Sequence, residues 1–132
     1  METAANHVPL LTQDQKRAKL VYDNVKKLEQ EPVAKKYGSL ALSAATLIRQ
    51  CGLVQAIAFY EAKGEEHCKR LVGHLQDELE KLGLLQPGKS LRATAMNCDL
   101  TTFMRLTRET LALCQWHKRF AQSILKVQPG EE

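Results

Sequence analysis

Apolar residues recur every three or four positions along most of this chain, which is the spacing of one face of a helix. No stretch alternates apolar and polar residues in the way that a half-buried strand does. The pattern predicts helices over about residues 12–29, 32–51, 53–63, 65–82 and 99–127, with a further turn of helix around 91–96. We therefore expect an all-α protein, a compact bundle of about five to six helices with a long C-terminal helix.

Several of these helices have recognisable ends. Thr12 is followed three residues later by Gln15, which predicts a capping box at the start of the first helix, and Asp99 is a typical N-cap for the last. Gly52 separates the second helix from the third, either as a helix end or as a close-packing point. The third helix, residues 53–63, is apolar nearly all round, which predicts that it is central in the bundle or covered by a partner.

The length of 132 residues leaves room for one core of useful size. We expect a flexible N-terminal arm over residues 1–11, a single helical-bundle domain over residues 12–128, and a short C-terminal tail over residues 129–132. No apolar run is long enough to cross a membrane, and the first residues lack the pattern of a secretory signal. The four cysteines form no CxxC pair and mostly occupy apolar helix positions, as reduced cysteines do, so we expect a cytoplasmic protein.

The chain is mildly basic, with a formal net charge of +4. The basic excess lies in residues 33–63 and in the last helix, whereas residues 65–82 are net acidic. One face of the last helix contains no carboxylate; its members are Thr101, Arg105, Arg108, Ala112, Gln115, Arg119, Gln122 and Lys126. Such a stripe could follow a phosphate backbone, but charge alone favours an ordinary solvated helix face.

The fourth helix carries the one group of potential metal ligands, which consists of His67, Cys68, His74 and Glu78. One helix face supplies at most two ligands, whereas a metal needs three or four that converge. We therefore interpret the two histidines as solvent-facing residues beside a salt bridge, and we expect neither a metal nor another cofactor.

Two further side chains on the last helix invite a functional interpretation. His117 stands beside Lys118 and Arg119 and could suggest a general base for RNA cleavage, but the sequence shows no partner for it, so we interpret it as a helix-surface residue. Trp116 could stack on a base, although a lone aromatic residue in an amphipathic helix is more often a packing or interface anchor. The sequence predicts no catalytic residue, and we expect that the protein is not an enzyme.

Two segments resemble the small-subunit family of type III-B CRISPR RNA-targeting (Cmr) complexes. Residues 35–64 read KKYGSLALSAATLIRQCGLVQAIAFYEAKG, and residues 106–125 read LTRETLALCQWHKRFAQSIL. The first helix, with Arg17, Ala18 and Val21, fits the family more loosely. The chain departs from the family pattern at Ala44–Ala45, where a proline is frequent, at Val54, where a second glycine is frequent, and at His117, where an apolar residue is common.

The resemblance implies a small helical bundle without nuclease activity that stacks along the repeated backbone subunit of the complex and beside copies of itself. It also implies contact with guide RNA and target RNA through their backbones, because base pairing reads the sequence. The residues that we expect to bind RNA are Lys35, Lys36, Arg49, Arg105, Arg108, Lys118 and Arg119. The alternative is a purely structural module that packs against protein partners and does not touch RNA.

Overall fold

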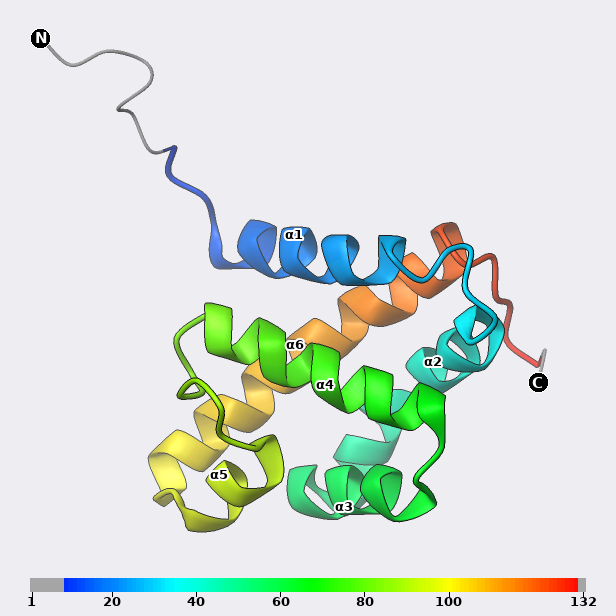
Figure 1. The fold of residues 1–132 in the computed structure, drawn as a ribbon. Helices are drawn as coiled ribbons and strands as arrows, with labels where there is room; N and C mark the ends of the chain where they lie inside the picture. The colour runs from blue at the N-terminus through cyan, green and yellow to red at the C-terminus, as the bar shows by residue number, and fades with distance from the viewer. Residues whose placement is uncertain (1–8, 131–132) are drawn as a thin grey trace, which may run out of the picture.

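A computed structural model describes residues 9–130 of the chain, and every regular element in that range is a helix (Figure 1). The helices are α1 (Gln13–Lys26), α2 (Ala34–Cys51), α3 (Leu53–Lys63), α4 (Glu66–Lys81), α5 (Leu91–Asn97) and α6 (Leu100–Ser123). The all-α class and the long C-terminal helix are confirmed. No helix within residues 9–130 is long and apolar enough to cross a membrane, and the cysteines at 51, 68, 98 and 114 are all unpaired.

The longest helix, α6, crosses the molecule behind α4 and forms its main packing surfaces with α2 and α1 (Figure 1). Of the two alternatives predicted for α3, the central position is wrong, because α3 lies at one end of the bundle and packs against α2, α4 and α5. Its inner side buries Leu53, Ile57 and Tyr60, but Phe59 on the other side is 49% exposed. An apolar helix of 11 residues at the end of a bundle can bury only one of its sides.

The sequence signals locate most helix ends. The Thr12 hydroxyl accepts a hydrogen bond from the Gln15 backbone at 3.0 Å, and the Gln15 side chain accepts one from the Thr12 backbone at 2.7 Å, so the capping box is confirmed. Gly52 joins α2 to α3 with φ of 88°, in the region that favours glycine. Three ends differ from the prediction by two residues or more: α1 ends at Lys26, α2 begins at Ala34 after a series of turns, and α6 ends at Ser123.

The chain turns sharply after α6 and folds back onto α2. Lys126 adopts a φ of 61°, which lets the Val127 backbone donate a hydrogen bond to the carbonyl of Ala121 at 3.1 Å. Val127 is thereby buried against Gly38 of α2, so closely that a Cβ added at Gly38 would overlap its side chain. Glycine at position 38 therefore sets how close the C-terminal segment comes to the bundle.

We expect Gly38→Ala to lower the free energy of unfolding by about 1–3 kcal/mol, because the new methyl group displaces Val127 from its site. The matched control is Gly73→Ala in α4, where an added Cβ meets no atom within 4 Å. That substitution should stabilise the protein by about 0.5–1 kcal/mol, since alanine is the better helix former. Urea denaturation measures both changes, and equal stabilities of the two variants would contradict the close approach.

Candidate functional site

The predicted RNA-binding residues of α6 lie at its surface. Arg105, Arg108 and Arg119 are exposed, and Lys118 is half-buried. The spacing of the three arginines places them on the side of α6 opposite its buried residues, which include Leu106, Leu113 and Ala121. The stripe of α6 is therefore open to solvent along most of the helix.

The other three predicted residues lie on α2, which packs along α6. Lys35 and Lys36 are exposed in its first turn, and Arg49 is exposed in its last turn. The 18 residues of α2 include no Asp or Glu. Burial, followed by the charge of Glu78, raises the pKa of Cys114 in α6 to about 12, and the charge of Arg49 partly opposes this shift.

Ion pairing separates these residues from the other three arginines of the chain, all of which bond carboxylates. Within residues 9–130, none of the seven candidates forms a salt bridge with a carboxylate. By contrast, Arg70 bonds Glu31 at 2.6 Å and Glu66 at 3.0 Å, and Arg92 bonds Glu61 at 2.7 Å. No carboxylate of residues 9–130 neutralises the seven candidates, although Arg119 donates one hydrogen bond to the neutral side chain of Gln122 at 3.5 Å.

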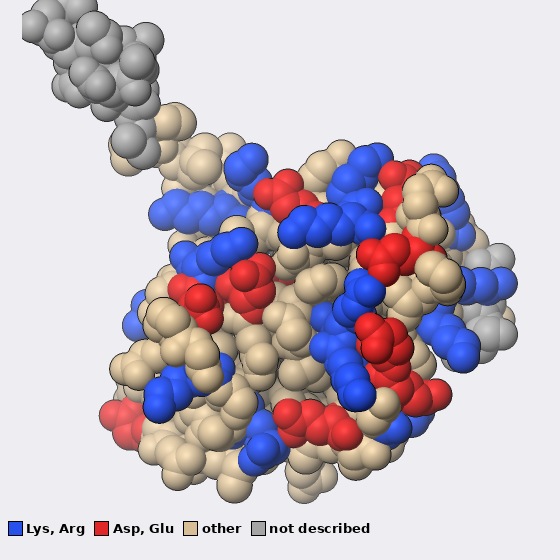
Figure 2. Space-filling model, viewed as in Figure 1, with Lys and Arg blue, Asp and Glu red and all other residues tan. Residues whose placement is uncertain are grey.

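The face of the molecule that carries α1, α4 and α5 has a different character. Figure 2 shows lysine and arginine side chains interspersed with aspartate and glutamate side chains across this face. Neighbouring charges of both signs cancel one another within a Debye length, about 8 Å at physiological salt. This face does not present the single sign of charge that attracts a polyanion.

The bundle also contains a buried polar network that the sequence analysis missed. The carboxylate of Glu78 accepts hydrogen bonds from Asn24 Nδ2 at 2.8 Å and lies 2.9 and 3.0 Å from Nε2 of His117. The Tyr37 hydroxyl lies 3.0 Å from Nδ1 of His117 and 2.8 Å from Nδ1 of His74. Glu78 and His117 are fully buried, so the network joins α1, α2, α4 and α6 at the centre of the protein.

One arrangement of protons satisfies every contact of this network. Burial, followed by the charge of Glu78, raises the pKa of Tyr37 well above its usual range, so its hydroxyl stays protonated. His74 can donate from Nδ1 to the Tyr37 oxygen, and Tyr37 then donates to Nδ1 of His117. His117 in turn can donate from Nε2 to Glu78. The network thus links four helices through hydrogen bonds between buried or half-buried side chains.

The network corrects two sequence-based interpretations. His117 is not a helix-surface residue, and His74, one of the two histidines interpreted as solvent-facing beside a salt bridge, is half-buried and bonded to Tyr37. The helical spacing indicates that His117 is on the buried side of α6, because His117 lies four positions after the buried Leu113 and four before the buried Ala121. The burial of the histidine and glutamate side chains of the network was not predicted, because such side chains are seldom found in a core unless they are paired. With both ring nitrogens occupied and no exposed surface, His117 is inaccessible to an RNA substrate in this structure.

The network predicts a dependence of stability on pH. Burial and then the neighbouring His117 lower the pKa of His74 from 6.5 to about 4. Between pH 6.5 and pH 4 the imidazole of His74 is protonated in the unfolded chain but not in the folded one. The contribution of His74 to the free energy of unfolding is therefore fully present above pH 6.5 and falls as the pH drops toward 4. We expect a loss of about 2–3 kcal/mol from this group. Urea denaturation at pH 7.0 and 4.5 should show a smaller loss for His74→Gln than for the wild type, and equal losses would contradict the assignment.

Trp116 is a packing residue, as its sequence context favours. Its ring stacks on Phe120 with centroids 5.4 Å apart, and its Nε1 donates a hydrogen bond to Asp14 of α1 at 2.9 Å. A second link between the same helices was not predicted, namely the paired hydrogen bonds from Arg17 to the buried carboxylate of Glu109. Together these contacts fix α1 on α6.

The potential metal ligands that lie together differ from the four considered in the sequence analysis. One potential ligand atom each from Glu65, His67 and Cys68 lie within 4.8 Å of one another at the start of α4. Three groups are the fewest that hold a metal, and they fall short of the four that structural zinc sites use. Burial also raises the pKa of Cys68, which disfavours the thiolate that a metal requires, and Glu65 lies 3.9 Å from Lys63. We assign no metal to this group.

The chain resembles known proteins over nearly its whole length. Residues 13–124 match the sequence profile of the family described as CRISPR-associated protein (Cas_Cmr5). A relative named CRISPR system Cmr subunit Cmr5, from Thermus thermophilus, is 35% identical over 115 residues, which are 87% of this chain and 97% of the relative.

The fold agrees with a solved structure. The crystal structure of a CRISPR-associated Cmr5 family protein from Thermus thermophilus matches with a TM-score of 0.76 and 33% identity. The match covers 88% of this chain and 99% of the other. At the family departure Ala44–Ala45 both residues are buried and α2 continues unbroken. The helix order, the two recognised segments and these matches agree, and the chain belongs to the Cmr5 family of CRISPR-associated proteins.

Proposed function

We propose that this protein is the non-catalytic small subunit of a cytoplasmic type III-B CRISPR complex and that it contacts the guide–target RNA. Residues 12–128 act as one domain that packs along the repeated backbone subunit and beside copies of itself. The observation that carries the proposal is the set of exposed or half-exposed cations on α2 and α6 that no carboxylate of residues 9–130 neutralises.

Two physical features support contact with RNA in particular. Arginine presents a planar fork of donors that matches phosphate oxygens, and three arginines follow one side of α6. RNA that is read by base pairing needs only backbone contacts from the protein, and such contacts come mainly from Lys and Arg. A surface that served protein packing alone would have no need for this single sign of charge.

The absence of catalysis is part of the same proposal. The histidine that stands beside the basic residues of α6 is buried and bonded at both nitrogens, which supports a structural role for it. We expect no products when the purified protein is incubated with labelled RNA and a divalent metal ion. RNA-cleaving activity that co-elutes with the protein at every purification step would overturn this part of the proposal.

Co-purification tests membership of the complex directly. The tagged chain is expressed in a host that carries the full CRISPR operon and is recovered under native conditions. We expect the larger subunits and guide RNA to be recovered with it in a fixed ratio. Recovery of the tagged chain alone, while the other subunits assemble without it, would contradict the proposal.

A further inference from the structure

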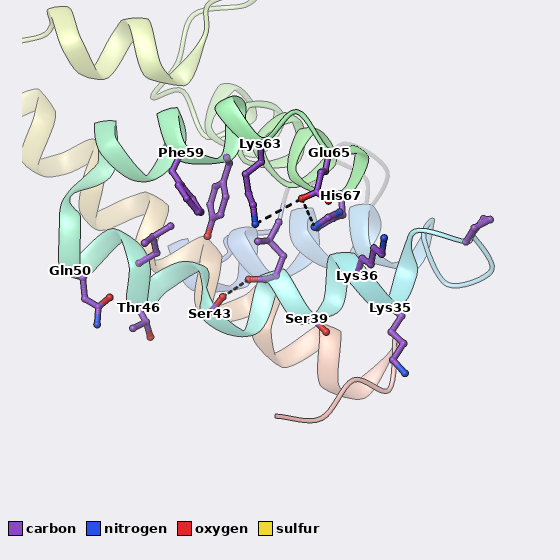
Figure 3. Close-up of a pocket in the computed structure, with 14 residues that line it drawn as sticks. Lys35, Lys36, Ser39, Ser43, Thr46, Gln50, Phe59, Lys63, Glu65 and His67 are labelled. Carbon is purple, nitrogen blue, oxygen red and sulfur yellow. Dashed lines mark hydrogen bonds and ion pairs between the residues drawn. The ribbon is translucent and has the colours of Figure 1, made fainter. Parts of the chain in front are cut away.

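A groove runs between α2 and α3 and opens at the start of α4. It encloses about 800 Å³, and the residues that shape it include Lys36, Leu40, Leu47, Phe59, Tyr60 and Lys63. Figure 3 shows Ser39, Ser43, Thr46 and Gln50 in a row along the α2 wall, with Phe59 and Lys63 on the α3 wall. Sites for small ligands commonly have about 300–1,000 Å³, so one nucleotide fits a groove of this size.

The charge of the groove is concentrated at one end. Lys36, Lys63 and His67 stand there, and Lys35 lines the outer edge of α2. One carboxylate, Glu65, faces these cations and lies 3.9 Å from Lys63 and 4.0 Å from His67. The three lysines outweigh this carboxylate, so the end of the groove favours an anion.

The rest of the groove offers an aromatic face and hydrogen-bonding groups. Phe59 exposes 49% of its surface, and the ammonium of Lys63 lies 5.3 Å from the centre of its ring. A planar cationic or aromatic group could replace that flexible ammonium over the ring. Tyr60 is only 2% exposed, lines the groove, and has a hydroxyl without a hydrogen-bond partner among residues 9–130. A buried hydroxyl of this kind gains from a ligand that accepts its proton.

We propose that the α2–α3 groove binds one unpaired nucleotide of RNA, with its base stacked on Phe59, an edge of the base accepting from Tyr60, and its phosphate between Lys36 and Lys63. This inference rests on the proposed contact with RNA. It adds contact with one base to the contacts with the RNA backbone. An apolar peptide would offer the three lysines no anion, whereas a nucleotide offers a phosphate to the lysines and a base to Phe59. Only an unpaired nucleotide can present a free face to Phe59, so the site selects unpaired RNA over duplex.

The test measures the affinity of the full chain for fluorescently labelled oligouridylate by anisotropy at several salt concentrations. We expect Phe59→Ala to weaken binding by roughly five- to 150-fold, the range found when a stacked aromatic is removed, without a change in salt dependence. The control is Met96→Ala on α5, which removes an apolar side chain of similar exposure (58%) and should bind as the wild type does.

Two further variants separate the parts of the site. Tyr60→Phe removes a hydroxyl that has no partner, so its thermal stability should equal or exceed that of the wild type while its affinity falls several-fold. The double variant Lys36→Glu/Lys63→Glu should reduce the log–log salt slope by about 0.7, which corresponds to the one phosphate held between the two lysines.

Each other outcome overturns the inference in a recognisable way. If Phe59→Ala and Tyr60→Phe bind as the wild type does while reversal of the α6 arginines weakens binding, the groove proposal fails and the proposed function stands. If these two variants bind RNA normally but no longer enter the complex, the groove holds a protein partner instead. If the wild type binds no RNA under any condition, both proposals fail.

Discussion

The Glu78→Ala variant is expected to lose about 3–5 kcal/mol of unfolding free energy, which is a large part of the stability of a domain of this size. Glu78 is fully buried and accepts hydrogen bonds from His117 and Asn24. Its removal leaves both donors without an acceptor and opens a cavity where α1, α4 and α6 meet. Because His117 is bonded to Tyr37 of α2, and Tyr37 in turn to His74, the loss extends to α2.

Urea denaturation at pH 7 measures this loss. The matched control is Glu80→Ala, which removes the same side chain from an exposed position of the same helix and should change stability by less than about 0.5 kcal/mol. Equal effects of the two substitutions would show that the buried carboxylate does not hold the network together.

The second large effect is expected from charge reversal of the α6 stripe. We expect Arg105→Glu/Arg108→Glu/Arg119→Glu to weaken the retention of target RNA by roughly a hundredfold, taking about 1 kcal/mol for each lost phosphate contact. The three residues are exposed, so folding and entry into the complex should survive. Filter binding of labelled target RNA to the purified complex measures the change.

A control variant with the same change in net charge excludes a general electrostatic effect. Lys69→Glu/Lys81→Glu/Lys89→Glu reverses three exposed cations on α4 and the turn that follows it. We expect this variant to retain RNA nearly as well as the wild type. If both triple variants lose RNA equally, net charge rather than the α6 stripe is responsible; if neither loses it, the protein is a scaffold without RNA contact.

Local signals were sufficient to predict the helices. Spacing of three and four residues identified every helix of the described range, and the capping box at Thr12 and the glycine at position 52 located two of their ends. Such features depend on neighbours within one or two turns, so they can be read from the sequence. The arrangement of the helices could not, because an apolar helix such as α3 suits the centre of a bundle and its end equally well.

The candidate site was only partly predictable for the same reason. Helical spacing correctly predicted that Arg105, Arg108 and Arg119 share an exposed side of α6. It could not distinguish them from Arg17, whose partner Glu109 lies 92 positions away in the sequence. Nor could it predict that His117, Glu78 and Tyr37 converge from three helices, because side-chain pairs of this kind are set by tertiary packing.

The most direct test of the proposed RNA contact is the salt dependence of RNA binding by the full-length protein. Affinity for single-stranded RNA is measured between about 50 and 200 mM salt, and the slope of log affinity against log salt counts the phosphates that the protein neutralises. Three to seven contacts from the cations of α2 and α6 predict a slope between about −2 and −5. A slope near zero, or no binding at the lowest salt, would contradict the account.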